Sequence, residues 1–317
     1  MTSSLPAVRF NAYLGRDLRQ DDPATLGRST LLLLADAVEA KNWSLTSTFL
    51  NYARQELARG LKALYSWLVD LLDQRLWNRA VSDSDPGVAK LLRGLLKSEP
   101  GAQAWQNATT ACERQDGGEV LRHAEVARQA MLTAHTILVA WIQELLSDLA
   151  SQGGDQAVFQ SLQRTDRQLW APRLEGWWVL SVHDRLCITA EQARSHLSGP
   201  DRRGNVEVFT YPDRHELVLD PCGTCGALRR DGVVTSLLSA HPWTAAQADM
   251  GCFAAHVPVA FTYLPAKRGQ VPPRVIKNCD THQPCRWLVY RRPEDIPPEL
   301  YVRLGLKPSQ VPEDHGA

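Results

Sequence analysis

The stretch DPCGTCGALRRDG, from Asp220 to Gly232, decides how the second half of this chain is interpreted. It places Cys222 and Cys225 three residues apart, among a proline and two glycines. A short predicted strand, ELVLD, leads into the first cysteine, and ALRRDG predicts a second strand with a tight turn. Such a turn aims two thiolates at one ion, while glycine tolerates the unusual backbone angles. The stretch therefore predicts a metal-binding turn between two strands.

In residue sequence and cysteine spacing, this turn resembles the zinc knuckle of zinc-ribbon and treble-clef proteins. The resemblance covers only the segment around Cys222, Gly223, Thr224, Cys225 and Gly226, and it implies a zinc ion (Zn2+) but no particular activity. Thiol redox chemistry at the same pair is the alternative. It is less favoured because a thioredoxin-type pair opens a helix, whereas here a strand is predicted to follow.

A closed tetrahedral zinc site needs four ligands, so further donors are expected downstream of the knuckle. The first choice of ligands is Cys222, Cys225, Cys252 and His256. If Cys252 begins a helical turn, His256 lies four residues further on the same face. A buried, unligated cysteine and a hydrogen-bonded core histidine are the ordinary alternatives for these two residues.

The second choice takes the distal ligand pair from the segment NCDTHQPC, which contains Cys279, His282 and Cys285. Its donors are three residues apart in a loop held by a proline, so it too can fold around a metal. A site with three protein ligands and a water would be catalytic, and His241 would then be a candidate neighbour. The sequence does not choose between these sets.

The first half of the chain is predicted to be helical. Asp22 and Pro23 form a helix start, an N-cap followed by proline at the first helical position, and this helix runs to about Ala40. Further helices are predicted from Ser44 or Thr46 to residue 71, over 88–97 and over 119–150, from apolar residues at helical spacing. Such helices joined by short loops predict an antiparallel bundle.

The second half of the chain has a different sequence pattern, which predicts strands. WWVLSV from Trp177, VEVFTY from Val206, RVIKN from Arg274 and RWLVY from Arg286 predict strands, in addition to ELVLD. The predicted fold class is therefore α+β: an N-terminal antiparallel helical bundle over residues 1–165, followed by a smaller α+β domain with a zinc knuckle over residues 166–317.

Composition limits the classes of function. The 317 residues carry 35 basic and 35 acidic side chains, so no global field favours nucleic acid, which is not an expected partner. The N-terminus does not look like a secretory signal, and the longest apolar run is too short to cross a membrane. A cytoplasmic location without membrane association is expected, where seven cysteines favour free thiols or metal ligands over disulfides. Motifs for serine hydrolases, P-loops and dinucleotide binding are absent from the sequence.

The favoured function is a zinc-binding cytosolic enzyme, in the class of metal-dependent hydrolases or lyases, that acts on a small molecule. The ten tryptophans suggest a Trp-lined cleft between the two domains. The first alternative is an interaction module with structural zinc that binds protein or nucleic acid. The second is a thiol redox protein that uses Cys222 and Cys225. Four protein ligands would indicate a structural ion, and three with a water would indicate catalysis.

Overall fold

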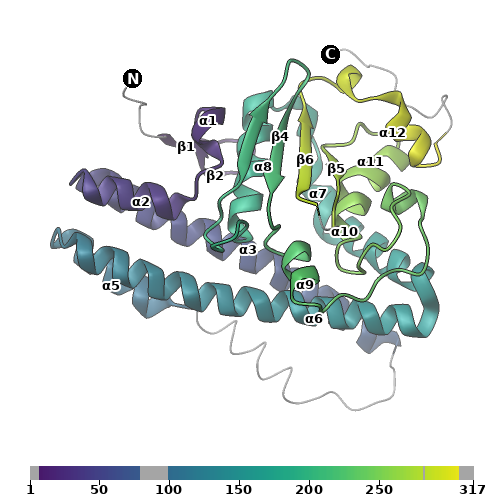
Figure 1. Cartoon of the computed structure of the whole chain (residues 1–317), viewed down its shortest axis with the longest axis horizontal. Helices are drawn as coiled ribbons and strands as arrows, with labels where there is room; N and C mark the ends of the chain where they lie inside the picture. Colours follow the sequence, from purple (N-terminus) through teal and green to yellow (C-terminus); the bar gives the residue numbers. More distant parts are fainter. Residues whose placement is uncertain (1–6, 79–98, 281–282, 307–317) are drawn as a thin grey trace.

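The computed structural model describes residues 7–78, 99–280 and 283–306. It combines helices with two small antiparallel sheets, as the predicted α+β class requires. In Figure 1 the long helices α3 (Trp43–Asn78) and α6 (Gly117–Thr165) run below the larger sheet, and the C-terminal elements lie beside its right-hand edge. The predicted helix over 88–97 lies outside the described residues.

The helices of the first half pack on one another. The predicted helix from Asp22 to Ala40 is two helices, each with its own N-cap: the Asp22 side chain accepts from the Ala24 amide, and the Ser29 side chain accepts from the Leu31 amide. The break at Gly27 brings the chain against Val206, which directly precedes strand β3 (Glu207–Thr210): a Cβ added at Gly27 would lie 2.1 Å from the Val206 carbonyl oxygen. Besides α3 and α6, the helices are α1 (Pro23–Leu26), α2 (Thr30–Glu39) and α5 (Ala102–Glu113).

One helical stretch, Gly117–Val179, is long and apolar enough to cross a membrane by length and composition alone. In its most apolar window, 44% of the residues are buried inside the fold. The core helix of a soluble protein passes the same test, so this stretch is weak evidence for a membrane span.

The larger sheet has the strand order β3-β4-β6-β5, with every neighbouring pair antiparallel. Leu219 at the end of β4 pairs with Cys285 at the start of β6, so these two strand ends lie side by side. The strands are β3 (Glu207–Thr210), β4 (Arg214–Leu219), β5 (Val275–Lys277) and β6 (Cys285–Tyr290), and a separate hairpin consists of β1 (Ala7–Asn11) and β2 (Arg16–Gln20).

Two predicted strands are helical instead. WWVLSV forms a 3-10 turn, η2 (Trp177–Val179), and is followed by helix α8 (Val182–Ser195). The Ser181 side chain is the N-cap of α8, because it accepts a hydrogen bond from the Asp184 amide. The indole N–H groups of Trp177 and Trp178 donate to the carbonyls of Pro273 and Val271, so the pair anchors a loop rather than a sheet. ALRR lies in helix α9 (Cys225–Arg230), so the predicted strand after Cys225 is also wrong.

The remaining elements of the second half are short. Several of them lie on the β5 side of the sheet in Figure 1. In chain order they are η1 (Asp166–Trp170), α7 (Ala171–Leu174), η3 (Pro242–Thr244), α10 (His256–Pro258), η4 (Val259–Tyr263), α11 (Leu264–Lys267), η5 (Pro293–Asp295) and α12 (Pro298–Arg303).

The largest cluster of buried apolar side chains takes residues from both sides of residue 165. Leu68 and Leu138 contribute from α3 and α6, and Leu186 and Leu217 contribute from α8 and β4. The helical half and the sheet half therefore share one core.

A network of charged side chains is buried between β2, α3 and α8. Arg194 on α8 donates to Glu56 on α3 at 2.8 Å, and Arg19 on β2 pairs with Asp21 at 2.7 Å. Thr30 connects the two pairs, since it accepts from Arg19 and donates to the Glu56 carboxylate. Burial, and next the nearby Arg194 charge, lower the pKa of Arg19 to about 10. This network fixes the hairpin and α8 onto α3.

His215 on β4 gives the fold a pH dependence. Burial, followed by the charges of Arg291, His183 and Arg185, lowers its pKa to about 4. Because the folded pKa lies below the unfolded value of about 6.5, this group's stability contribution is complete above pH 6.5 and is lost as pH falls toward 4. Between pH 7 and pH 4, we expect the free energy of unfolding of His215→Gln to fall by about 2 kcal/mol less than that of the parent. Urea unfolding at the two pH values measures both decreases. Equal losses in both proteins would contradict this expectation.

Candidate metal centre

The CGTC turn begins where β4 ends, and it is held against the end of α8. Gly199 donates its amide to the Pro221 carbonyl at 3.0 Å, and the Ser198 hydroxyl accepts from the Gly223 amide at 3.2 Å. Arg202 donates to the Gly223 carbonyl at 2.9 Å. The turn then enters α9 at Cys225. These contacts give both cysteines a fixed backbone.

Gly223 has no room for a side chain. A Cβ atom there would lie 1.7 Å from the His196 carbonyl oxygen, which belongs to the backbone and cannot rotate away. We therefore expect Gly223→Ala to displace the CGTC turn and to destabilise the protein by about 2 kcal/mol or more. Thermal unfolding checks this, with Gly118→Ala as the control, since a Cβ there would meet only the Asp116 side chain, at an ordinary contact distance of 3.6 Å. An unchanged melting temperature for Gly223→Ala would contradict it.

A second pair of cysteines reaches the same place from the β5–β6 connection. Cys279 follows β5, and its neighbours Asn278 and Asp280 both have positive φ, 55° and 58°. The buried Asp280 carboxylate accepts two bonds of 2.9 Å from Arg229 on α9, and it also accepts the Gly251 amide at 2.6 Å. This ion pair ties the loop that carries Cys279 to the helix that carries Cys225.

Four thiols therefore converge at one end of the sheet. The Cys225 sulfur lies 3.6 Å from the Cys222 sulfur and 3.8 Å from the Cys279 sulfur. Cys279 also interacts with the Cys285 thiol, which in turn is close enough to influence Cys222. All four are buried and unoxidised. Both sulfur separations exceed the roughly 2.05 Å of a disulfide bond.

The electrostatics of the cluster favour one negative charge at its centre. Contacts with the Cys222 and Cys279 thiols hold the pKa of Cys225 well below its usual range. The same interaction with Cys225, together with burial, raises the pKa of Cys222 and of Cys279. Several thiolates in one buried place repel each other, so full ionisation requires a cation.

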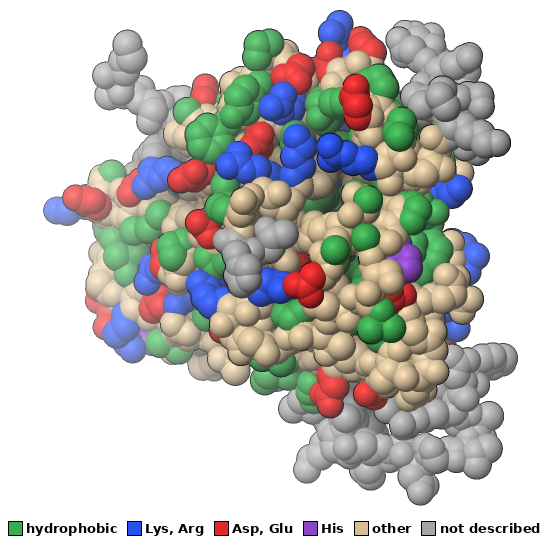
Figure 2. All heavy atoms as spheres, turned by 45° about the vertical axis from the view of Figure 1, so that its right-hand side comes forward, with side chains coloured by type: hydrophobic (Ala, Val, Ile, Leu, Met, Phe, Trp, Pro, Cys, Tyr) green, Lys and Arg blue, Asp and Glu red, His purple; other side chains and the backbone are tan. Residues whose placement is uncertain are grey.

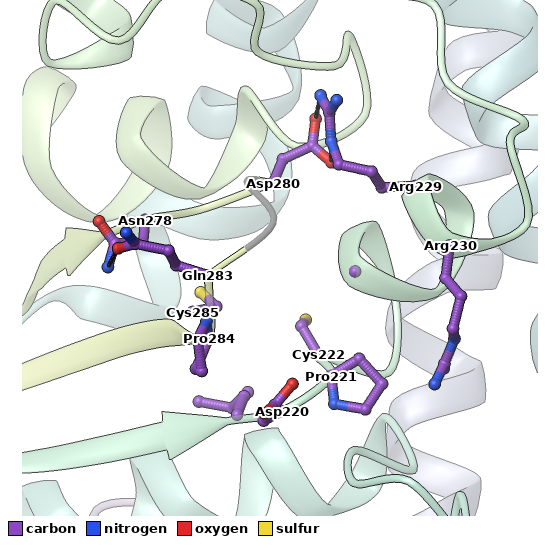
Figure 3. Close-up of a pocket in the computed structure, with 12 residues that line it drawn as sticks. Asp220, Pro221, Cys222, Arg229, Arg230, Asn278, Asp280, Gln283, Pro284 and Cys285 are labelled. Atoms are coloured by element: carbon purple, nitrogen blue, oxygen red, sulfur yellow. Dashed lines mark hydrogen bonds and ion pairs between the residues drawn. The ribbon is translucent and has the colours of Figure 1, made fainter.

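A pocket of about 380 Å³ adjoins the cluster. Figure 3 shows the sulfur atoms of Cys222 and Cys285 at this pocket, and the Arg229–Asp280 ion pair across from them. The pocket reaches the surface at the exposed Arg230. Its other lining residues are Leu219, Asp220, Pro221, Gly226, Asn278, Gln283 and Pro284, so no tryptophan lines it.

Cys252 has hydrogen-bond and charge neighbours that differ from those of the two knuckle cysteines. It is fully buried, its amide donates to the Thr235 carbonyl at 2.9 Å, and burial followed by the Asp155 charge raises its pKa to about 11. In the described parts of the chain, no contact links its sulfur to the sulfur of Cys222 or Cys225. The ordinary interpretation of a buried thiol is consistent with this environment.

His256 lies beside the cluster in an aromatic setting. Its ring centre is 4.6 Å from that of Trp67 and 5.0 Å from that of Phe253, and its Nδ1 is 2.6 Å from the Phe253 carbonyl oxygen. Burial lowers its pKa, and the nearby Cys225 opposes this shift. The structure thus brings His256 near Cys225, with the ring already bonded to a backbone carbonyl.

His241 is engaged elsewhere. Its Nε2 lies 2.6 Å from the Asp155 carboxylate, which also accepts the amides of Leu238 and Ser239, and its ring stacks on Trp243. This arrangement pins an irregular segment to α6. His282, in the second predicted ligand set, lies outside the described residues.

Within residues 7–78, 99–280 and 283–306, no group of three or more His, Cys, Asp or Glu side chains has the arrangement needed to hold a metal ion. The thiol cluster comes nearest to such an arrangement, with three sulfurs linked by contacts of 3.6 and 3.8 Å and a fourth beside them. No family model, no curated protein and no solved structure matches this chain.

Proposed function

We propose that this protein binds one zinc ion through the thiolates of Cys222, Cys225, Cys279 and Cys285, and that the ion is structural. The convergence of these buried thiols carries the proposal. Four sulfurs at 2.3 Å from a tetrahedral zinc lie about 3.8 Å from one another, close to the separations of 3.6 and 3.8 Å between three of them.

A structural role follows from the ligand count. Four protein ligands leave no coordination position for a water or a substrate, so the ion would not act as a Lewis acid. It would instead fasten α9 to the β5–β6 loop, beside the Arg229–Asp280 ion pair. The proposal therefore favours an interaction protein with structural zinc over a metal-dependent hydrolase or lyase. The tryptophan-lined cleft draws no support from the pocket, whose walls contain other residues.

Among macromolecular partners, we favour protein over nucleic acid. Basic and acidic side chains are interspersed over the face in Figure 2, and the formal net charge of the chain is zero. Nucleic-acid binders present a basic patch or stripe to the phosphate backbone. Binding to a duplex oligonucleotide, with an affinity that falls steeply with salt, would argue for nucleic acid instead.

Metal analysis tests the proposal directly. We expect the purified, reduced full-length chain to contain about one zinc per molecule, and a strong chelator to lower its melting temperature. Cobalt substitution should give the absorption of a tetrahedral four-thiolate site rather than that of a mixed thiolate and imidazole site. A zinc content near zero after purification and zinc reconstitution would overturn the proposal.

A further inference from the structure

The four thiols of the cluster differ in their access to solvent. Cys222 and Cys285 line the pocket, whereas Cys225 and Cys279 are not among its lining residues. The pocket, at about 380 Å³, is large enough for a small reagent beside the two sulfurs (Figure 3). A structural zinc site buried on all sides would offer no such approach.

Each thiol at the pocket has a second thiol next to it. The Cys225 sulfur lies 3.6 Å from that of Cys222 across the CGTC turn, and Cys279 is in contact with Cys285. A disulfide needs a sulfur separation of about 2.05 Å, and residues in a Cys-x-x-Cys turn reach it without unfolding. The geometry therefore places a thiol that can meet an oxidant and a resolving thiol in one turn.

We infer that this metal centre is a hydroperoxide-sensitive switch, in which Cys222 is oxidised from the pocket and forms a disulfide with Cys225. The inference rests on the proposed zinc site. The Cys222 thiolate attacks one oxygen of hydrogen peroxide, the O–O bond breaks, and hydroxide leaves, so that Cys222 becomes a sulfenic acid. The Cys225 thiolate then attacks this sulfur and displaces a second hydroxide. Two thiolates thus lose two electrons, peroxide gains them, and the ion loses two of its four ligands.

Loss of the ion has a defined structural result. The Arg229–Asp280 ion pair would then hold α9 to the β5–β6 loop, and the pairing of Leu219 with Cys285 would hold the end of β4 to the start of β6. The pocket lies between these two segments, so oxidation would change its walls. Reduction by a dithiol restores the thiolates and permits zinc to bind again.

The test uses the zinc-loaded full chain and a few equivalents of hydrogen peroxide. We expect release of about one zinc per chain, followed with a chromogenic chelator, and at least a tenfold faster release than in buffer alone. Peptide mapping should recover the Cys222–Cys225 disulfide, and dimedone should trap a sulfenic acid at Cys222 before any at Cys225. Dithiothreitol with added zinc should restore the metal content.

The matched control is Cys112→Ser, which removes a buried thiol in α5, outside the cluster, and should release zinc at the parent rate. Zinc that stays bound at excess peroxide, or oxidation that begins at Cys252 or Cys112, would overturn the switch while leaving the zinc site intact. A chain that never holds zinc would overturn the proposed function and the switch together. Metal content before oxidation thus distinguishes the two failures.

Discussion

Cys279→Ser is expected to purify with less than about a tenth of the parent's zinc and to lose about 4 kcal/mol or more of stability. In the proposed four-thiolate site, removing one thiolate would leave three ligands, and because metal binding is coupled to folding, the zinc content and the stability would fall together. Zinc content by elemental analysis and unfolding in urea measure the two effects. Cys279 is the informative position because only the second ligand set predicted from the sequence contains it.

The matched variant is Cys252→Ser. Cys252 is also fully buried and belongs to the first ligand set, but its sulfur has no contact with Cys222 or Cys225 among the described residues. We expect it to keep about one zinc per chain. If Cys252→Ser lost the metal while Cys279→Ser retained it, the set Cys222, Cys225, Cys252 and His256 would be correct.

The second large effect concerns the buried ion pair between α3 and α8. Glu56→Ala is expected to lower the free energy of unfolding by about 3 to 5 kcal/mol. In this variant Arg194 and Arg19 would both remain buried, and the Asp21 carboxylate would be their one remaining acidic partner in the network. The side chains of Arg194 and Glu56 are 1% and 4% exposed, so water cannot replace the missing partner. Urea unfolding at pH 7 with saturating zinc measures the loss.

The double variant Glu56→Leu/Arg194→Met provides the control for this pair. Replacing both partners by apolar side chains removes the unpaired charge, so its loss should be smaller than that of Glu56→Ala. If Glu56→Ala lowered the free energy of unfolding by less than about 1 kcal/mol, the ion pair would contribute little to stability.

The strands ELVLD, RVIKN and RWLVY were predictable from the sequence because their β-branched and aromatic residues alternate or cluster between turn signals. WWVLSV carries the same signal but is helical. There the Trp177 and Trp178 indoles bond to distant carbonyls, and Ser181 caps a helix one residue later. Tertiary contacts override local preference at this segment.

Local spacing identifies Cys222 and Cys225, because one turn carries both, and it also singles out Cys279 and Cys285 in the second predicted ligand set, but it does not choose between the two sets. The second pair depends on strand order: β6 inserts between β4 and β5, and this places Cys285 opposite Leu219. No local pattern encodes that order. The helix at Cys225 was also missed, so the argument against redox chemistry that rested on a following strand no longer holds.

The antiparallel pairing of β4 with β6 also sets the order of events during synthesis. A growing chain that has passed Cys225 but not Cys285 has at most three of the four sulfurs, and the sheet that aligns them is incomplete. The ribosome must therefore release the last strand of the sheet before the proposed four-thiolate coordination shell could assemble. Metal capture by nascent chains of increasing length would report when that long-range strand pairing is achieved.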